Sequence, residues 1–176
     1  MSKEENKRIA RMVIEAYNSN NLALFDNYFD PNVIWKNLPY REGLERRGIK
    51  AVKSQFQEGL IAFPDLKYLI QEIMAEKDKV WIYGPFEGTH KGYFIGIPPT
   101  GNRVKFDIAF LFHFKTNKIV KASVILDSLT VFIQLGRAIL KENKEEQIRE
   151  YLNSLQALGL IRKNVKIEYG KNSEPD

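Results

Sequence analysis

The sequence predicts an α+β fold, in which helices cover one face of a curved antiparallel sheet. Apolar residues recur at helical spacing in the first third of the chain, and long segments rich in β-branched and aromatic residues follow in the middle. Helical spacing returns after residue 128. Because the long strands come in one run, this order is typical of α+β domains and not of alternating α/β domains.

Three helices are expected in the N-terminal part. The first covers residues 4–18 and has one apolar face. A short second helix over 22–29 stops before Pro31, because proline disfavours helical geometry in the residue that precedes it. A third helix over 49–63 is closed by Pro64.

The predicted strands are recognised by their β-branched and aromatic residues. A short strand is expected at 33–35, and long antiparallel strands are expected at 66–75, 80–89, 103–114 and 119–126. Turn residues at 76–78 and 116–117 indicate hairpins between neighbouring long strands.

The C-terminal part is expected to be helical. One helix begins at Ser128 and another covers 144–158, and a strand-like segment follows at 165–169. We therefore expect one domain over residues 1–141 and a C-terminal helical extension and tail over 142–176. The extension either covers the mouth of the domain or builds a dimer contact.

Composition narrows the classes of function. The N-terminus does not resemble a signal peptide and no run of ~20 apolar residues is present, so we expect a cytoplasmic protein with no membrane partner. Zero cysteines and two histidines argue against disulfides and metal sites, and the known nucleotide-binding glycine motifs do not occur, so no cofactor is expected. The net charge of +5 is interleaved with glutamate, which argues against a nucleic-acid partner.

Two strands carry polar residues in apolar surroundings, and the alternation of side chains sorts these residues onto faces. On 103–114 the even positions are all apolar, whereas His113 lies on the odd face beside Leu111, a face that is either a pocket wall or a partly wet exterior. Asp127 ends the apolar strand that follows. Burial among hydrocarbon raises the pKa of a carboxyl group and makes it usable as an acid or base near neutral pH.

Each candidate also has a purely structural interpretation. Asp127 precedes the helix that begins at Ser128, and aspartate is a preferred helix cap. From the residues alone, His113 is more readily interpreted as a hydrogen-bonded structural histidine, and His90 as an exposed turn residue. The large aromatic residues in the chain are most often ordinary core.

The segment GTHKGYFIGIPPTG at residues 88–101 resembles the signature loop of the SnoaL-like polyketide cyclase family. The similarity continues in register and covers residues 7–136, including an aspartate followed by a helix that ends in Gln-Leu-Gly. This resemblance implies an NTF2-like cone, a curved antiparallel sheet wrapped around N-terminal helices, here with an extra C-terminal helix. It also implies a homodimer and cofactor-free, aldol-type chemistry on a small hydrophobic carbonyl compound.

The resemblance places Asp127 on the family's catalytic acid/base aspartate and His113 on an active-site histidine. Asp127 would then move the proton, and His113 would hold or protonate the developing oxyanion. The expected substrate-binding residues are Tyr17, Trp35, Trp81, Phe86, His90 and Ser123. Ser123 stands where many relatives have tryptophan, so the pocket is expected to be enlarged or differently polar.

Three further functions fit the same cone, since a fold does not settle function. The first is noncatalytic binding of a small molecule, with Asp127 acting only as a cap or a hydrogen-bonding group. The second is isomerisation of the ketosteroid isomerase type. The third is epoxide hydrolysis, for which Asp107 and Arg103 would have to converge on one water.

Overall fold

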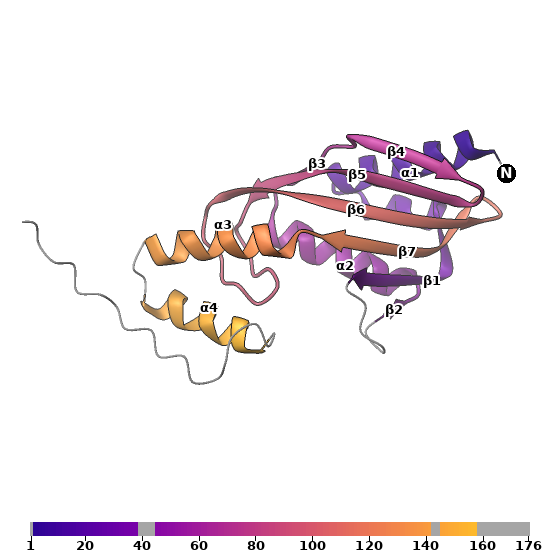
Figure 1. The fold of residues 1–176 in the computed structure, drawn as a ribbon. Coiled ribbons are helices and arrows are strands. Elements are labelled where there is room, and N and C mark those ends of the chain that lie inside the picture. The colour runs from indigo at the N-terminus through magenta and orange to yellow at the C-terminus, as the bar shows by residue number, and fades with distance from the viewer. Residues whose placement is uncertain (1, 39–44, 142–144, 158–176) are drawn as a thin grey trace, which may run out of the picture.

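A curved sheet with helices against one of its faces forms the centre of the molecule (Figure 1). The computed structural model describes residues 2–38, 45–141 and 145–157. The helices are α1 (Lys3–Asn18), the 3-10 helix η1 (Leu22–Asn27), α2 (Ile49–Ala62), α3 (Ser128–Lys141) and α4 (Glu145–Ala157). The strands are β1 (Phe29–Leu38), β2 (Arg46–Arg47), β3 (Lys67–Tyr68), β4 (Glu72–Glu76), β5 (Lys79–Thr89), β6 (Arg103–Lys115) and β7 (Lys118–Leu126).

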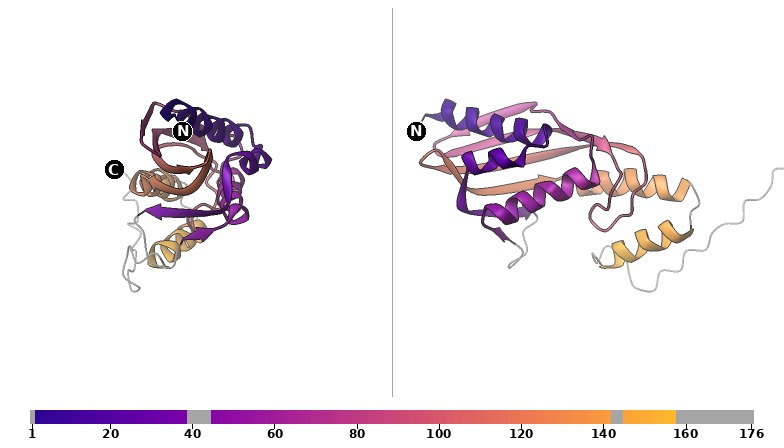
Figure 2. Two further views of the ribbon diagram at one scale, coloured as in Figure 1. Left: turned by 90° about the vertical axis from the view of Figure 1, so that its right-hand side faces the viewer. Right: turned by 180° about the vertical axis from the view of Figure 1, so that it is seen from behind.

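The sheet follows the order β2-β1-β7-β6-β5-β3, and β4 also pairs with β5. Among the described strands every pairing is antiparallel except that of β1 with β7, which is parallel. The view from behind in Figure 2 shows α1 and α2 across one face of the sheet, which we call the inner face. The opposite face is called the outer face. The predicted α+β cone is therefore confirmed.

Residue type explains why the main elements form where they do. The Ser2 hydroxyl accepts a hydrogen bond from the Glu5 amide at 3.1 Å and so caps the start of α1. The even positions of β6 are apolar because they face the helices across the core, and Phe112 among them is fully buried. The turn at residues 116–117 has positive φ at both positions, which fits the predicted tight hairpin between β6 and β7.

The structure differs from the sequence predictions at several points. The segment at 66–75 forms two strands, because four steps from Tyr68 to Glu72 oppose three steps from Phe86 to Tyr83, which is a β-bulge. The second helix is a 3-10 helix that ends two residues earlier than expected. Strand β2 was not predicted, and the strand-like segment at 165–169 lies outside the described residues.

None of the helices within residues 2–38, 45–141 and 145–157 is both long and apolar enough to span a bilayer. Helix α4, which begins beyond the predicted domain, packs on α3 in Figure 1 and buries Ile148.

Candidate active site

A cavity of about 610 Å³ lies inside the cone, within the range of small-molecule pockets. Its walls come from the inner face of the sheet, from α1 and α2, from α3, and from the loop between β5 and β6. Nine of the 19 residues that line it are aromatic. Trp35 and Phe56 meet edge to face with ring centres 5.0 Å apart, and Phe86 stacks on Phe106 at 4.8 Å. Such walls favour a flat apolar ligand.

Helix α2 presents one polar edge to the cavity. Gln55, Glu58 and Gly59 are spaced at i, i+3 and i+4, so they share one side of the helix, and all three line the cavity. The hydroxyl of Tyr17, from α1, lies against Gly59. Most of the polar groups therefore gather along one wall, and Ser128 and Tyr93 add a hydroxyl each elsewhere.

Tyr17 supplies a neutral phenol to this wall. Burial raises the pKa of its hydroxyl above the ordinary value of 10, since the charged phenolate is poorly solvated there. Within the described residues no hydrogen bond to this hydroxyl is found. The protonated Tyr17 hydroxyl can therefore donate a hydrogen bond to a ligand oxygen in the cavity.

A chain of hydrogen bonds orients the amides on the same wall. The Trp35 Nε1–H donates to Asn37 Oδ1 at 2.8 Å, and Asn37 Nδ2 donates to Gln55 Oε1 at 3.3 Å. Because the Gln55 side-chain oxygen already accepts a hydrogen bond from Asn37, the Gln55 amino group is left to donate to a ligand. The wall thus offers amide donors beside the Tyr17 phenol.

An ion pair closes this polar wall on the side of β2. Both Glu58 carboxylate oxygens lie 3.0 Å from the guanidinium nitrogens of Arg46, and the two side chains are partly exposed. Such a fork-to-fork contact holds the carboxylate in one orientation. Glu58 is the only carboxylate among the described residues that line the cavity.

Asp127 does not lie in this cavity. Its side chain is exposed on the outer face, where Oδ1 accepts from the Thr130 amide at 3.1 Å at the start of α3. Hydrogen bonds from Thr130 lower the pKa of the Asp127 carboxyl below its ordinary value. The expectation of an enclosed carboxyl with a raised pKa is therefore wrong, and the geometry is that of the helix cap.

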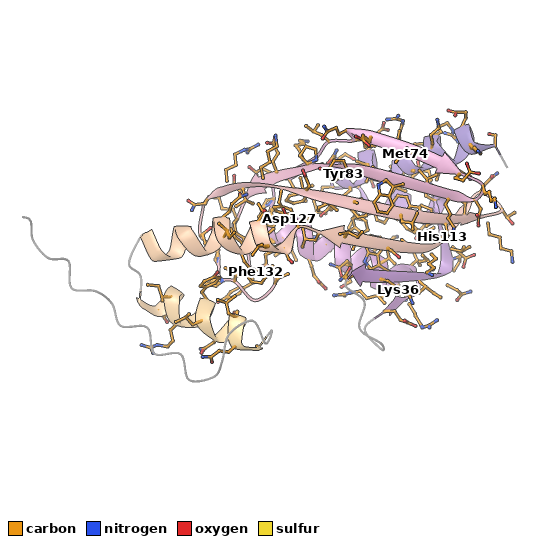
Figure 3. The ribbon with its side chains drawn as sticks, in the orientation of Figure 1. Lys36, Met74, Tyr83, His113, Asp127 and Phe132 are labelled. Carbon is orange, nitrogen blue, oxygen red and sulfur yellow. The ribbon has the colours of Figure 1, made fainter. Side chains whose placement is uncertain are left out.

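His113 also lies on the outer face and far from Asp127 (Figure 3). The Asp127 amide bonds to Asp107, six positions before His113 on β6, which corresponds to roughly 20 Å along a strand. Burial, followed by the charges of Lys121 and Lys79, lowers the pKa of His113. The structure does not bring the two predicted catalytic residues together.

The predicted substrate-binding residues divide into two groups. Tyr17, Trp35 and Phe86 line the cavity as expected. Trp81 and Ser123 lie on the outer face, because their strand partner Leu111 occupies an odd position of β6.

His90 is neither an exposed turn residue nor part of the cavity wall. It is fully buried against Phe63, and its Nδ1 lies 3.3 Å from the Thr100 amide and 3.2 Å from the Thr100 hydroxyl. Burial lowers the pKa of His90 to about 4, so the ring is neutral near pH 7. The histidine ties the two ends of the β5–β6 loop together.

The residues that an epoxide hydrolase would need are not assembled. Asp107 lies on the outer face, where it accepts a hydrogen bond from the Tyr83 hydroxyl. Arg103 pairs with Asp65 and Glu87. These groups do not meet at the cavity, so the convergence that epoxide hydrolysis would require is not found among the described residues.

Sequence reasoning missed five polar residues that line the cavity, Asn37, Arg46, Gln55, Glu58 and Ser128. A signal for Asn37 was present, since it shares the face of the buried residues Val33 and Trp35 on β1, although its own side chain is exposed. Arg46 gave no such signal, because its strand is only two residues long.

Comparison with known proteins agrees with this architecture. AclR from Streptomyces galilaeus, named as a candidate hydroxylase, is 27% identical with a TM-score of 0.68, over 77% of this chain and 98% of its own. A protein from Acidithiobacillus ferrooxidans, named as a candidate polyketide cyclase, is 28% identical with a TM-score of 0.65, over 78% and 99%. IdmH from Streptomyces antibioticus, at 24% identity, TM-score 0.65 and coverage of 74% and 98%, shows the same fold.

Among curated proteins no significant match to this chain is found. The family model of SnoaL-like polyketide cyclases matches residues 7–135, which is most of the chain and runs from within α1 to the middle of α3. The chain therefore belongs to the SnoaL-like polyketide cyclase family.

Proposed function

We propose that the protein binds a small, flat carbonyl compound in the cone and moves a proton next to that carbonyl. Membership of the family supports a small-molecule role of the cyclase or isomerase type. The observation that carries the proposal is the aromatic cavity of about 610 Å³ with the neutral Tyr17 phenol and the Glu58 carboxylate on one wall.

The proposed chemistry needs one donor and one base. The Tyr17 hydroxyl donates to the substrate carbonyl oxygen, and Glu58 removes a proton from the adjacent carbon, which leaves an enolate. In an aldol closure the enolate carbon attacks a second carbonyl of the same molecule, and the new alkoxide takes the proton back from Glu58. In an isomerisation the proton returns to a different carbon. Neither route changes the composition of the substrate.

This assignment replaces the one suggested by the sequence. Asp127 and His113 face away from the cavity, so neither can touch a ligand held there. Glu58 is within the cavity wall and is oriented by Arg46, which favours it as the proton-transfer group.

Noncatalytic binding is the second candidate. On β7 the inward positions next to the cavity are Val124 and Leu126, with Ala122 before them, so this strand contributes hydrocarbon and no titratable group. A cavity of this kind can hold an apolar ligand without reacting with it.

We further propose that the chain forms a homodimer through the outer face. Met74, Trp81, Leu111 and Ile125 lie there, and Met74 and Ile125 are 57% and 42% exposed. Apolar side chains of this size on a sheet face are better buried against a second copy than left in water.

The enzyme and binding proposals separate in one experiment with the fluorescent aryl ketone prodan. Binding is followed by fluorescence, and deuterium uptake beside its carbonyl is followed by NMR in D2O. Glu58→Gln is expected to lower catalysed exchange by on the order of 10²-fold or more, since it removes the base and keeps the shape. Tyr17→Phe is expected to lower it by on the order of 10²-fold, since it removes one oxyanion donor.

Asp127→Asn is the matched control and is expected to exchange deuterium at the wild-type rate. If Asp127→Asn abolishes exchange while Glu58→Gln retains it, the assignment of the base is wrong. If the wild type binds prodan without accelerating exchange, noncatalytic binding is the better description.

A further inference from the structure

Helix α4 lies beyond the residues matched by the family model and contacts two segments that line the cavity. Figure 1 shows it beside α3 and the loop between β5 and β6. Its contacts come from Glu150, Tyr151 and Ser154, which share one side of the helix at i, i+1 and i+4.

The first contact holds a tight turn of the loop. Phe94 and Ile97 exchange backbone hydrogen bonds of 3.1 and 2.9 Å across Ile95 and Gly96, which both have positive φ. Positive φ is costly for a β-branched residue such as Ile95, so the turn needs support from outside. The Ser154 hydroxyl provides this support by donating a hydrogen bond to the Gly96 carbonyl oxygen.

The turn and α4 approach each other as closely as their atoms allow. A Cβ at Gly96 would lie 3.0 Å from Ser154 Oγ and 3.1 Å from Ser154 Cβ. Next to the turn, the exposed Tyr93 hydroxyl donates to Glu150 at 3.3 Å. The turn is therefore held from two points on one helix, and Tyr93, Phe94 and Ile95 line the cavity.

The second contact holds α3. The Tyr151 hydroxyl donates to the Phe132 carbonyl oxygen at 3.2 Å, and it lies so close to Gly136 that a Cβ there would be 2.4 Å away. Phe132 lines the cavity, and Ile148 of α4 is buried at this junction. One helix thus fastens two separate parts of the cavity wall.

We infer that α4 is a clasp that sets the largest ligand the cavity admits, with Tyr151 and Ser154 as its specificity-determining residues. The inference rests on the proposed ligand binding in the cone. Phe94, Ile95 and Phe132 form the wall on this side, and their backbones are fixed from behind by α4. When the Tyr151 and Ser154 hydroxyl contacts are removed, this wall can move and the cavity admits a longer ligand.

The test uses prodan and its homologues with acyl chains of three to ten carbons. Each buried methylene raises affinity about fourfold while the chain fits. In the wild type the affinity is expected to rise with chain length and then to fall once the chain meets the wall held by α4. In Tyr151→Phe/Ser154→Ala this maximum is expected to move to a chain at least two carbons longer, with at least tenfold tighter binding of the longest homologues.

The matched controls each remove one side-chain hydroxyl at a position away from α4. Tyr83→Phe deletes a hydroxyl on the outer face, and Ser54→Ala deletes one on the exposed side of α2, and both are expected to keep the wild-type maximum. Thermal unfolding checks that each variant is folded. If the double variant does not fold, the single variant Ser154→Ala is tested in its place. It removes only one hydroxyl from a helix surface, so we expect it to fold.

The outcomes separate the clasp from the proposed function. If the wild type binds the short ketones and the variants keep its chain-length maximum, the clasp is overturned and ligand binding stands. A wild type without any maximum also overturns the clasp. If no ketone binds to the wild type, the proposed function and the clasp fall together.

Discussion

The phenol oxygen of Tyr17 lies against the backbone of Gly59, where a Cβ would sit 2.3 Å from it. This contact joins α1 to α2 and turns the hydroxyl along the polar edge formed by Gln55 and Glu58. The next-nearest atom to that Cβ is Tyr17 Cζ, at the ordinary contact distance of 3.5 Å. The hydroxyl alone therefore requires glycine at this position.

Gly59→Ala is expected to destabilise the wild type by ~1–3 kcal/mol, because the new methyl group collides with a buried hydroxyl. In a Tyr17→Phe background the same substitution is expected to be neutral or to stabilise by up to ~1 kcal/mol, since alanine is the better helix former. Urea denaturation of the four proteins in this double-mutant cycle measures the difference. A destabilisation of the same size in both backgrounds would show that the hydroxyl is not the cause.

The sequence predicted the fold well where the signal was local. The apolar even positions of β6 identified its inner face, and the turn residues at 116–117 located the hairpin. The parallel pairing of β1 with β7 was not predictable in this way, because it joins segments about 90 residues apart and depends on how the sheet curves.

Asp127 shows why the site was harder to predict than the fold. Alternation groups Ser123, Ile125 and Asp127 on one face, but it does not say which face is inner. The outer face is itself rich in apolar side chains, and Ala109 on it is only 7% exposed, so it resembled a pocket wall. Only the position of α1 and α2 distinguishes the two faces.

Asp127→Asn is expected to leave prodan affinity within twofold and stability within ~0.5 kcal/mol, because asparagine caps helices about as well as aspartate. Asp127→Ala is expected to lose ~1 kcal/mol with unchanged affinity, since the cap is removed and the cavity is not touched. Thermal unfolding and probe titration measure both quantities. A loss of affinity in either variant without a loss of stability would place Asp127 in contact with the ligand.

The stability that Asp127 contributes is also expected to depend on pH. Its pKa is lowered in the folded state, so the stabilisation is present above the ordinary carboxyl pKa and is lost as the pH falls through the lowered value. Asp127→Asn has no such dependence. The wild type should therefore lose stability relative to Asp127→Asn as the pH falls, and an unchanged difference between the two proteins would contradict the cap.

His90 is expected to destabilise the fold in mild acid. Its folded pKa of about 4 lies below the ordinary value of 6.5, so the unfolded chain binds the proton more tightly and stability falls as the pH drops from 6.5 to about 4. A shift of this size corresponds to up to about 3 kcal/mol. His90→Asn keeps an acceptor for the Thr100 amide and removes the titration, so it should flatten this part of the pH profile. Equal slopes for the two proteins, measured by urea denaturation at each pH, would show that His90 does not titrate as expected.

Two clusters of opposite charge lie at different places along the outer face, and this favours an antiparallel pairing of two copies. Asp107 and Asp127 form the acidic end near Tyr83, with Lys105 and Arg103 further along β6, whereas Lys79 and Lys121 form the basic end around His113, with Glu76 opposite Lys79. A two-fold axis through the centre of the face would bring the acidic end of one copy onto the basic end of the other.

Ile125 lies in the apolar part of this face, and Ile125→Lys is expected to convert the dimer to a monomer, because it buries an unpaired charge at the contact. Ile61→Lys is the matched control, since Ile61 is 60% exposed on α2, away from the sheet. Light scattering after size exclusion should give twice 20.5 kDa for the wild type and the control, and 20.5 kDa for Ile125→Lys. Because paired charges at the rim are screened by salt, the wild-type dimer should also dissociate more readily at 1 M NaCl than at 0.1 M. A wild type that is monomeric at tens of micromolar would contradict the proposed contact.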